Sequence, residues 1–133
     1  MQGFGNTSLV YLNAALAVDS ADKVALLGRG KCYGMMKMYD KSIVDYNKYL
    51  KLEPNDDKVM CDMGVYYQFL GKFKASIAMF DQAIGLNPGM GLYFLNRSYS
   101  FYGAGNKINA RADAKQAEKL GTLVPESYKQ LIK

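Results

Sequence analysis

The amino-acid sequence predicts an all-α fold in which antiparallel helix pairs stack one after another as a solenoid. A single motif occurs twice, 34 residues apart. It begins with a large apolar residue, followed by glycine four positions later and an aromatic residue seven positions later, then by a small residue, an aromatic residue and proline. Apolar residues recur with the 3.6-residue helical period, and no segment shows sustained alternation with period two. A fixed period of this length is typical of solenoids, in which each unit buries its apolar face against its neighbours.

The two copies of the motif align residue by residue. The first copy contains Leu26, Gly30, Tyr33, Ser42, Tyr46, Tyr49 and Pro54. The second copy contains Met60, Gly64, Tyr67, Ser76, Phe80, Ala83 and Pro88. Each residue of the second copy follows its counterpart by one period, so both segments are expected to fold alike.

Breaker residues divide the chain into the predicted helices. Gly34 and Gly71 follow or end the first helix of each copy, and Pro54 and Pro88 follow second helices that cannot continue through proline. Asn, Asp and Gly residues beside the prolines supply caps and turns, and the short connections between helices require antiparallel pairs. The predicted helices are 7–18, 23–36, 40–52, 57–70, 73–86, 91–104, 107–120 and 125–132.

The pattern resembles the tetratricopeptide repeat, whose signature has a bulky residue, Leu-Gly, Tyr, a small residue, an aromatic residue, Ala and Pro at set spacings. This resemblance implies a right-handed superhelical solenoid that forms a single domain over residues 1–133. Residues 23–56 and 57–90 match full repeats, and 91–124 resemble a third. Residues 3–22 match the second half of a preceding repeat, and 125–133 resemble a C-terminal capping helix.

Several positions depart from this signature. The motif glycines let the two helices of a repeat approach closely, and Ser98 takes their place in the third repeat. Ala114 replaces the aromatic residue of the second helix there, so we expect the capping helix to fill the remaining space. Arg29 and Arg97 replace the usual Leu, which predicts partial contact with solvent at both positions.

The N-terminal half repeat is a second helix without its first helix. We expect its Leu12 and Ala15 side to pack on helix 23–36, and we expect Leu9 and Leu16 to lie on an exposed flank. Because solenoids normally end in a polar cap, this predicts that the chain is part of a longer protein. An exposed apolar flank also predicts weak homo-oligomerisation.

Composition argues against catalysis and against metal or cofactor binding. The chain contains no His, which excludes Ser/His/Asp and Cys/His triads and His-ligated metals. Its glycine pairs match no phosphate-binding spacing, so we expect no enzyme, no cofactor and no metal. Cys32 and Cys61 are expected to be free thiols; this favours the cytoplasm over an oxidising compartment but leaves the localisation open.

The charge pattern and hydropathy exclude two further classes of partner. The net charge of +5 is spread at helix-surface spacing and not clustered with aromatic residues, so no nucleic-acid binding is expected. No apolar run approaches the roughly 20 residues of a membrane span, so no direct membrane insertion is expected. The partner class that remains is a protein or peptide.

In tetratricopeptide repeats, the first helix of each repeat lines a concave groove. Carried over to this chain, the peptide-binding positions are Leu27, Lys31, Met35, Lys58, Cys61, Val65, Gln68, Phe69, Leu92, Leu95, Tyr99 and Tyr102. The Lys, Asn and Arg residues of a carboxylate clamp are missing: Leu27 stands where the first Lys would be and Asp62 where an Asn would be. Leu92 and Asn96 stand where the second Lys and the Arg would be. The predicted groove is therefore largely apolar.

Two interpretations of these apolar positions remain open. Either packing within the chain and the capping helix cover them, or they receive a peptide or helix of a partner. The function predicted is a non-catalytic protein-protein interaction scaffold. The alternatives are a self-assembling structural unit that stacks through its repeat ends, and an accessory domain of a larger membrane or enzyme polypeptide.

Overall fold

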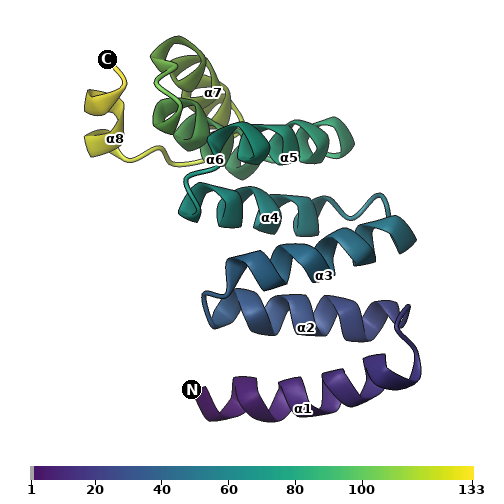
Figure 1. Ribbon diagram of the computed structural model, residues 1–133. Helices are drawn as coiled ribbons and strands as arrows, with labels where there is room; N and C mark the ends of the chain where they lie inside the picture. Colours follow the sequence, from purple (N-terminus) through teal and green to yellow (C-terminus); the bar gives the residue numbers. More distant parts are fainter. Residues whose placement is uncertain (1) are drawn as a thin grey trace. The chain divides into compact units, whose positions relative to one another are not determined.

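The computed structural model describes the backbone of residues 2–133 and the side chains from residue 6 onward; Met1 lies outside the described residues (Figure 1). The regular structure of this part of the chain is entirely helical, which confirms the all-α class. The helices are α1 (Gln2–Val18), α2 (Lys23–Met35), α3 (Tyr39–Leu52), α4 (Asp57–Phe69), α5 (Phe73–Leu86), α6 (Gly91–Gly103), α7 (Lys107–Lys119) and α8 (Glu126–Leu131).

The chain divides into two compact units, Met1–Asp56 and Asp57–Lys133, at the predicted boundary between the first two full repeats. In unit 1, α2 packs against α1 and against α3. In unit 2, α5 and α6 pack against each other, α4 contacts both of them, and α7 packs on α6. The single domain over 1–133 and the handedness of its superhelix stay predictions.

Most helix boundaries agree with the prediction within about two residues, and two local features differ. The first helix begins at Gln2, so the polar segment Asn6–Ser8 lies inside α1 and does not start it. The left-handed residue after α2 is Lys37, with φ 60°, whereas Gly71 and Gly105 hold this position in the next two repeats. Glycine is the usual residue at this left-handed position, because a Cβ strains the left-handed conformation. Gly34 is not at this position and lies buried inside the last turn of α2.

Each full repeat is closed by a glycine that faces an aromatic ring. A Cβ placed on Gly30 would lie 2.5 Å from the ring of Tyr46 in α3, and one placed on Gly64 would lie 2.6 Å from the ring of Phe80 in α5. Both rings are 0% exposed. The absence of a side chain on the first helix therefore makes room for the largest buried side chain of the second.

A buried serine ties the two helices together beside this contact. Ser42 Oγ donates to the carbonyl oxygen of Gly30 at 2.7 Å, and Ser76 Oγ donates to that of Gly64 at 2.6 Å. In the third pair the hydroxyl lies on the other helix, since Ser98 Oγ of α6 donates to the carbonyl of Ala110 in α7 at 2.6 Å. The bond between the helices is kept while its donor changes sides.

The C-terminal helix fills the space that Ala114 leaves in the third pair. Tyr128 of α8 is 6% exposed, and its hydroxyl lies 2.8 Å from Ser98 Oγ. Val124 and Ile132 join the same buried cluster, which also holds Ala114. The expected compensation by a capping helix is therefore confirmed.

Arg29 joins three helices of unit 1. Its Nε and Nη2 each donate to one carboxylate oxygen of Asp45 in α3 at 2.7 Å, and its Nη1 donates to Asn13 Oδ1 of α1 at 3.0 Å. The Asp45 side chain is 2% exposed and the Arg29 side chain 21%. The predicted partial contact of Arg29 with solvent is thus correct, but the guanidinium is paired and holds α1, α2 and α3 together.

Unit 2 repeats this arrangement once and replaces it once. Arg97 donates two bonds of 2.8 Å to Asp113 in α7 and one of 2.8 Å to Asp81 in α5. In the intervening repeat the positions of the arginine and its main carboxylate partner hold Met63 and Met79. Both charged members are thus exchanged together for apolar side chains, which avoids an unpaired buried charge.

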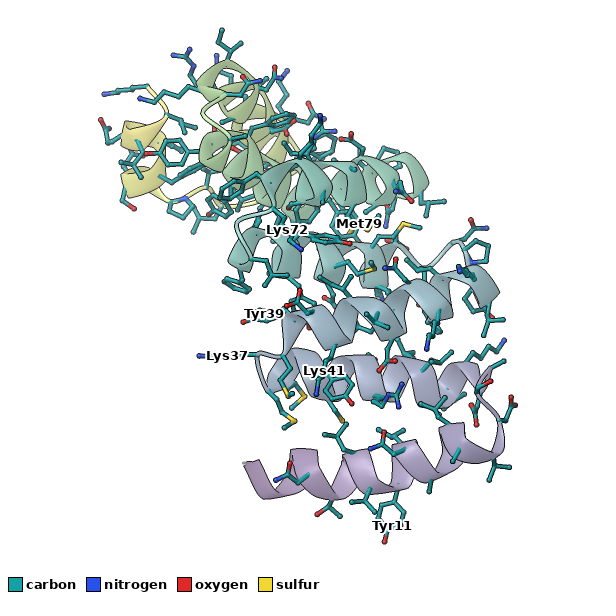
Figure 2. The ribbon with its side chains drawn as sticks, in the orientation of Figure 1. Tyr11, Lys37, Tyr39, Lys41, Lys72 and Met79 are labelled. Carbon is teal, nitrogen blue, oxygen red and sulfur yellow. The ribbon has the colours of Figure 1, made fainter. Side chains whose placement is uncertain are left out.

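The helix α1 packs differently from the prediction. Leu12 faces α2 as expected, since its Cδ2 would lie 3.0 Å from a Cβ on Gly28. Leu16 is only 9% exposed, so its assignment to the exposed flank is wrong, and Leu9 is half-buried. The exposed flank carries Tyr11 instead, whose ring points away from α2 (Figure 2). Leu16 follows Leu12 by four residues and therefore lies on the same face of the helix, not on the opposite flank.

We expect Gly64→Leu to destabilise unit 2, because the added side chain enters the space of the Phe80 ring. Overpacking of this kind costs about 1–3 kcal/mol or more. Gly85→Leu in α5 is the matched control: no atom lies within 4 Å of a Cβ placed on Gly85, so loss of a helical glycine there should raise stability slightly. Thermal melting followed by circular dichroism compares the two, and an unchanged midpoint for Gly64→Leu would contradict the observed contact.

We expect Arg97→Met to cost about 3 kcal/mol, because it leaves the Asp113 carboxylate buried without its main partner. The double variant Arg97→Met/Asp113→Met should recover most of that loss, since it recreates the methionine pair of the preceding repeat. Urea denaturation of the two single variants and the double variant measures the coupling. Additive losses would show that the two side chains do not act as a pair.

Candidate functional site

The predicted binding positions of unit 1 lie on α2, and two of the three are exposed. Met35 is 84% exposed, Lys31 is exposed and Leu27 is half-buried. Val24, one turn before Leu27, is 75% exposed. The helix thus presents apolar side chains at both ends and one cation between them.

The predicted positions on α4 of unit 2 are divided between surface and interior. Phe69 is 64% exposed and Lys58 is exposed, while Val65 and Gln68 are half-buried. Cys61 is 8% exposed and belongs to the interior of the unit. Since Val65 and Phe69 are four residues apart, they share one face of the helix.

Side-chain hydrogen bonds join α4 to α6 near both ends of their contact. Gln68 Nε2 donates to the carbonyl of Asn96 and to Ser100 Oγ, both at 2.6 Å. At the other end, Tyr93 donates to Asp57 Oδ2 at 2.6 Å, and this bond lowers the pKa of Asp57. The amide of Gln68 is therefore engaged between the two helices, and α4 and α6 are held at both ends.

Most predicted positions on α6 are covered within unit 2. Leu95 is 6% exposed and belongs to the cluster beneath α8. The rings of Tyr99 and Tyr102 meet the ring of Tyr128 edge to face, with centroids 4.6 and 5.9 Å apart. Leu92 stays open at 48% exposure. Packing within unit 2 thus covers Leu95 and contacts both tyrosine rings, as the first of the two interpretations expected.

One position of the repeat carries a large apolar side chain at the surface in both units. Met35 and Phe69 lie one 34-residue period apart, at the C-terminal ends of α2 and α4. The third repeat has Gly103 there, and a Cβ on Gly103 would lie 2.3 Å from the Phe73 ring. The sequence predicted Met35 and Phe69 as groove positions but left open whether packing covers them, and it gave no sign that the Phe73 ring closes this position in the third repeat.

The described residues contain no group of three or more His, Cys, Asp or Glu side chains placed to hold a metal ion. None of the helices in this part of the chain has the length and hydropathy needed to cross a bilayer. Every buried side-chain nitrogen and oxygen described has a hydrogen-bond partner. The exposed positions therefore offer apolar contact area, and the exposed lysines Lys31 and Lys58 lie on the same helices.

Sequence comparison identifies two repeats at the predicted positions. Residues 24–56 and 57–90 match two family models, each described as "Tetratricopeptide repeat". Over 83 residues, 62% of this chain, the sequence is 31% identical to human "Tetratricopeptide repeat protein 28" and 28% identical to mouse "Tetratricopeptide repeat protein 34". The matched segment spans only 3% and 15% of those two proteins.

Structural comparison finds the same fold in solved proteins. The structure "MamA MSR-1 C2" superposes with a TM-score of 0.84 at 24% identity, over 90% of this chain and 69% of that one. A structure of MamA AMB-1 superposes with a TM-score of 0.77 at 26% identity, over 82% of this chain and 64% of that one. These similarities confirm the predicted class of helix-pair solenoid.

We expect the two thiols to react at different rates with a disulfide reagent at pH 8. Burial, and secondarily the carboxylate of Asp62, raises the pKa of the Cys61 thiol to about 11, so little of the reactive thiolate forms. Cys32 is half-buried and should react first. The absorbance of the released reagent should show one thiol per chain reacting fast and the second reacting slowly. Cys32→Ser should remove the fast phase. Rapid reaction of Cys61 in the folded protein would place it on an open surface.

Proposed function

Because the chain belongs to the tetratricopeptide repeat family, we propose that this protein-interaction scaffold binds an apolar peptide or helix of a partner protein on the first helices of its repeats. The binding positions are the exposed members of the predicted set, described for each unit by itself. In unit 1 these are Lys31 and Met35. In unit 2 they are Lys58, Phe69 and Leu92, and the half-buried Val65 shares the helix face of Phe69.

The observation that carries this proposal is the exposure of Met35 and Phe69 at one position of two successive repeats. Met35 is 84% exposed and Phe69 64%, so most of each side chain is accessible within its own unit. Aromatic residues and methionine are enriched in the buried parts of protein interfaces. A large apolar side chain kept at the surface in both repeats is therefore best explained by a partner that covers it.

One exposed lysine beside Met35, and another at the opposite end of α4 from Phe69, favour a partner with acidic residues. Lys31 lies one turn before Met35 on α2, and Lys58 lies at the first turn of α4. Exposed charges at the rim of an interface change the association rate and its salt dependence more than the affinity. The ligand class proposed is an amphipathic segment with apolar anchors and flanking Asp or Glu.

The packing of α6 narrows the proposed surface. Cys61 and Leu95 are buried, and Tyr99 and Tyr102 support Tyr128 of the capping helix. We therefore expect Tyr99→Ala to lower the melting temperature, whereas Phe69→Ala should leave it nearly unchanged. The proposed mode involves no catalysis: the protein positions one polypeptide against another.

We expect peptides selected against the intact chain from a random displayed library to contain apolar anchors and acidic residues. Phe69→Ala should weaken their binding about 30-fold, which corresponds to a hot-spot loss of about 2 kcal/mol. Ile108→Ala is the matched control, since Ile108 is 73% exposed on α7, outside the proposed surface. Fluorescence anisotropy of a labelled peptide measures both variants.

The outcome that would overturn the proposal is selected peptides whose affinity is the same for wild type, Met35→Ala and Phe69→Ala. Loss of binding to the Ile108→Ala control would likewise place the partner site elsewhere. Raising the salt concentration should slow association while leaving the effect of Phe69→Ala intact.

A further inference from the structure

The turn after α2 holds a lysine in a backbone conformation that favours glycine. Lys37 has φ 60°, and no other non-glycine residue in the described part of the chain has a positive φ. One and two periods later, Gly71 and Gly105 have φ 71° and 82°. A Cβ in this left-handed region crowds the backbone and lowers stability. The first repeat therefore keeps an unfavourable residue where the next two have the favourable one.

The turn itself does not require the lysine. The backbone nitrogen of Lys37 donates to the carbonyl three residues before it at 3.0 Å, and those of Gly71 and Gly105 make the same bond at 2.9 and 3.0 Å. In all three turns the next residue donates to the carbonyl five residues before it, at 2.8 Å. Since glycine forms these bonds without strain in two repeats, the side chain of Lys37 needs a separate explanation.

The Lys37 side chain is directed into solvent. It is exposed and extends away from the helices of unit 1 (Figure 2). None of the ion pairs among the described residues includes it. Its charge therefore offsets none of the backbone strain within the chain. Backbone strain that is retained in this way is typical of positions that act in binding.

Lys37 belongs to a group of three exposed lysines around the exposed side chain of Met35. Lys31 precedes Met35 by one helical turn, and Lys37 follows it by two residues. Lys41 lies in the first turn of α3. Its ammonium lies 5.6 Å from the centre of the Tyr33 ring of α2, so it reaches back toward the helix that carries Met35.

This group of lysines is particular to the first repeat. The corresponding positions of the next two repeats are uncharged: Val65, Gly71 and Ala75 in the second, and Tyr99, Gly105 and Asn109 in the third. Within residues 31–41 the three lysines stand against one acidic residue, Asp40, so the net charge of the segment is +2. An exposed apolar side chain among cations is complementary to an apolar anchor that has acidic neighbours.

We propose that Lys37 and Lys41 select the partner of unit 1: carboxylates of an acidic peptide segment contact the two ammonium groups while its apolar anchor covers Met35. This inference rests on the binding surface proposed above and extends it from α2 onto the turn before α3. Lys37 places its charge beside Met35 despite the backbone strain, so stability and selectivity oppose each other at this position.

The test uses a selected acidic peptide whose binding Met35→Ala weakens, and a copy of it in which Asn and Gln replace every Asp and Glu. Lys37→Gln and Lys41→Gln should each slow association of the acidic peptide about threefold at low salt, as for an exposed ion pair, and leave the neutral copy unchanged. Lys51→Gln is the matched control, because it removes the same charge from the opposite end of α3 and should leave both rates nearly unchanged. Stopped-flow fluorescence measures the rates.

Lys37→Gly separates the strain from the charge. It should slow the acidic peptide as much as Lys37→Gln does, and it should also raise the melting temperature by about 3 °C, because glycine relieves the left-handed backbone. A melting temperature that does not rise would remove the argument from strain and overturn the proposal.

Three binding results would also overturn the proposal. The first is an acidic peptide that Met35→Ala weakens but that associates equally fast with wild type and Lys37→Gln; the binding surface proposed above would then stand without this selectivity. The second is a set of peptides that Phe69→Ala weakens and Met35→Ala does not, since unit 1 would then take no part in binding. The third is a set of selected peptides without acidic residues.

Discussion

The close approach of two helices at a glycine is the contact on which each full repeat depends. At Gly30 and Gly64 a Cβ would penetrate the ring of Tyr46 or Phe80, so the backbone of one helix forms the wall against which the largest buried side chain of the other is packed. Protein interiors are packed too densely to absorb such a change elsewhere. The contact brings the Ser42 and Ser76 hydroxyls within bonding distance of the carbonyls they satisfy.

The buried polar groups show that contacts are exchanged between repeats as complete sets. In the third repeat the pair Ser98 and Ala114 stands where the first two repeats have a glycine and an aromatic residue. The hydroxyl that bonds the two helices moves to the other helix at the same time. Arginine with aspartate alternates with a pair of methionines at the corresponding positions. In both cases a single exchange would leave a clash, a void or an unpaired charge, each costly in a packed interior. The repeat is thus conserved as a set of contacts and not as a set of residues.

The same packing decides which side chains are left for partners. Gln68 is hydrogen-bonded between α4 and α6. Leu95 is buried in the cluster that the capping helix covers, and the rings of Tyr99 and Tyr102 pack against the Tyr128 ring of that helix. The large apolar side chains of Met35 and Phe69 stay mostly exposed within their units, at 84% and 64%. Within each unit the proposed binding positions lie on helices that are already packed, so a partner bound there would order few additional residues.

By itself the sequence determined the period, the all-helical class, the helix pairs and the need for a cap opposite Ala114. These follow from local signals, since helical spacing, glycine and proline act within one or two turns. Only the tertiary structure decided which apolar positions are open. Leu16 and Leu95 are buried while Tyr11 and Phe69 are exposed, although all four lie on helices with apolar residues on several sides. Exposure depends on which neighbouring helix covers a face, and that is set by contacts between residues far apart in the sequence.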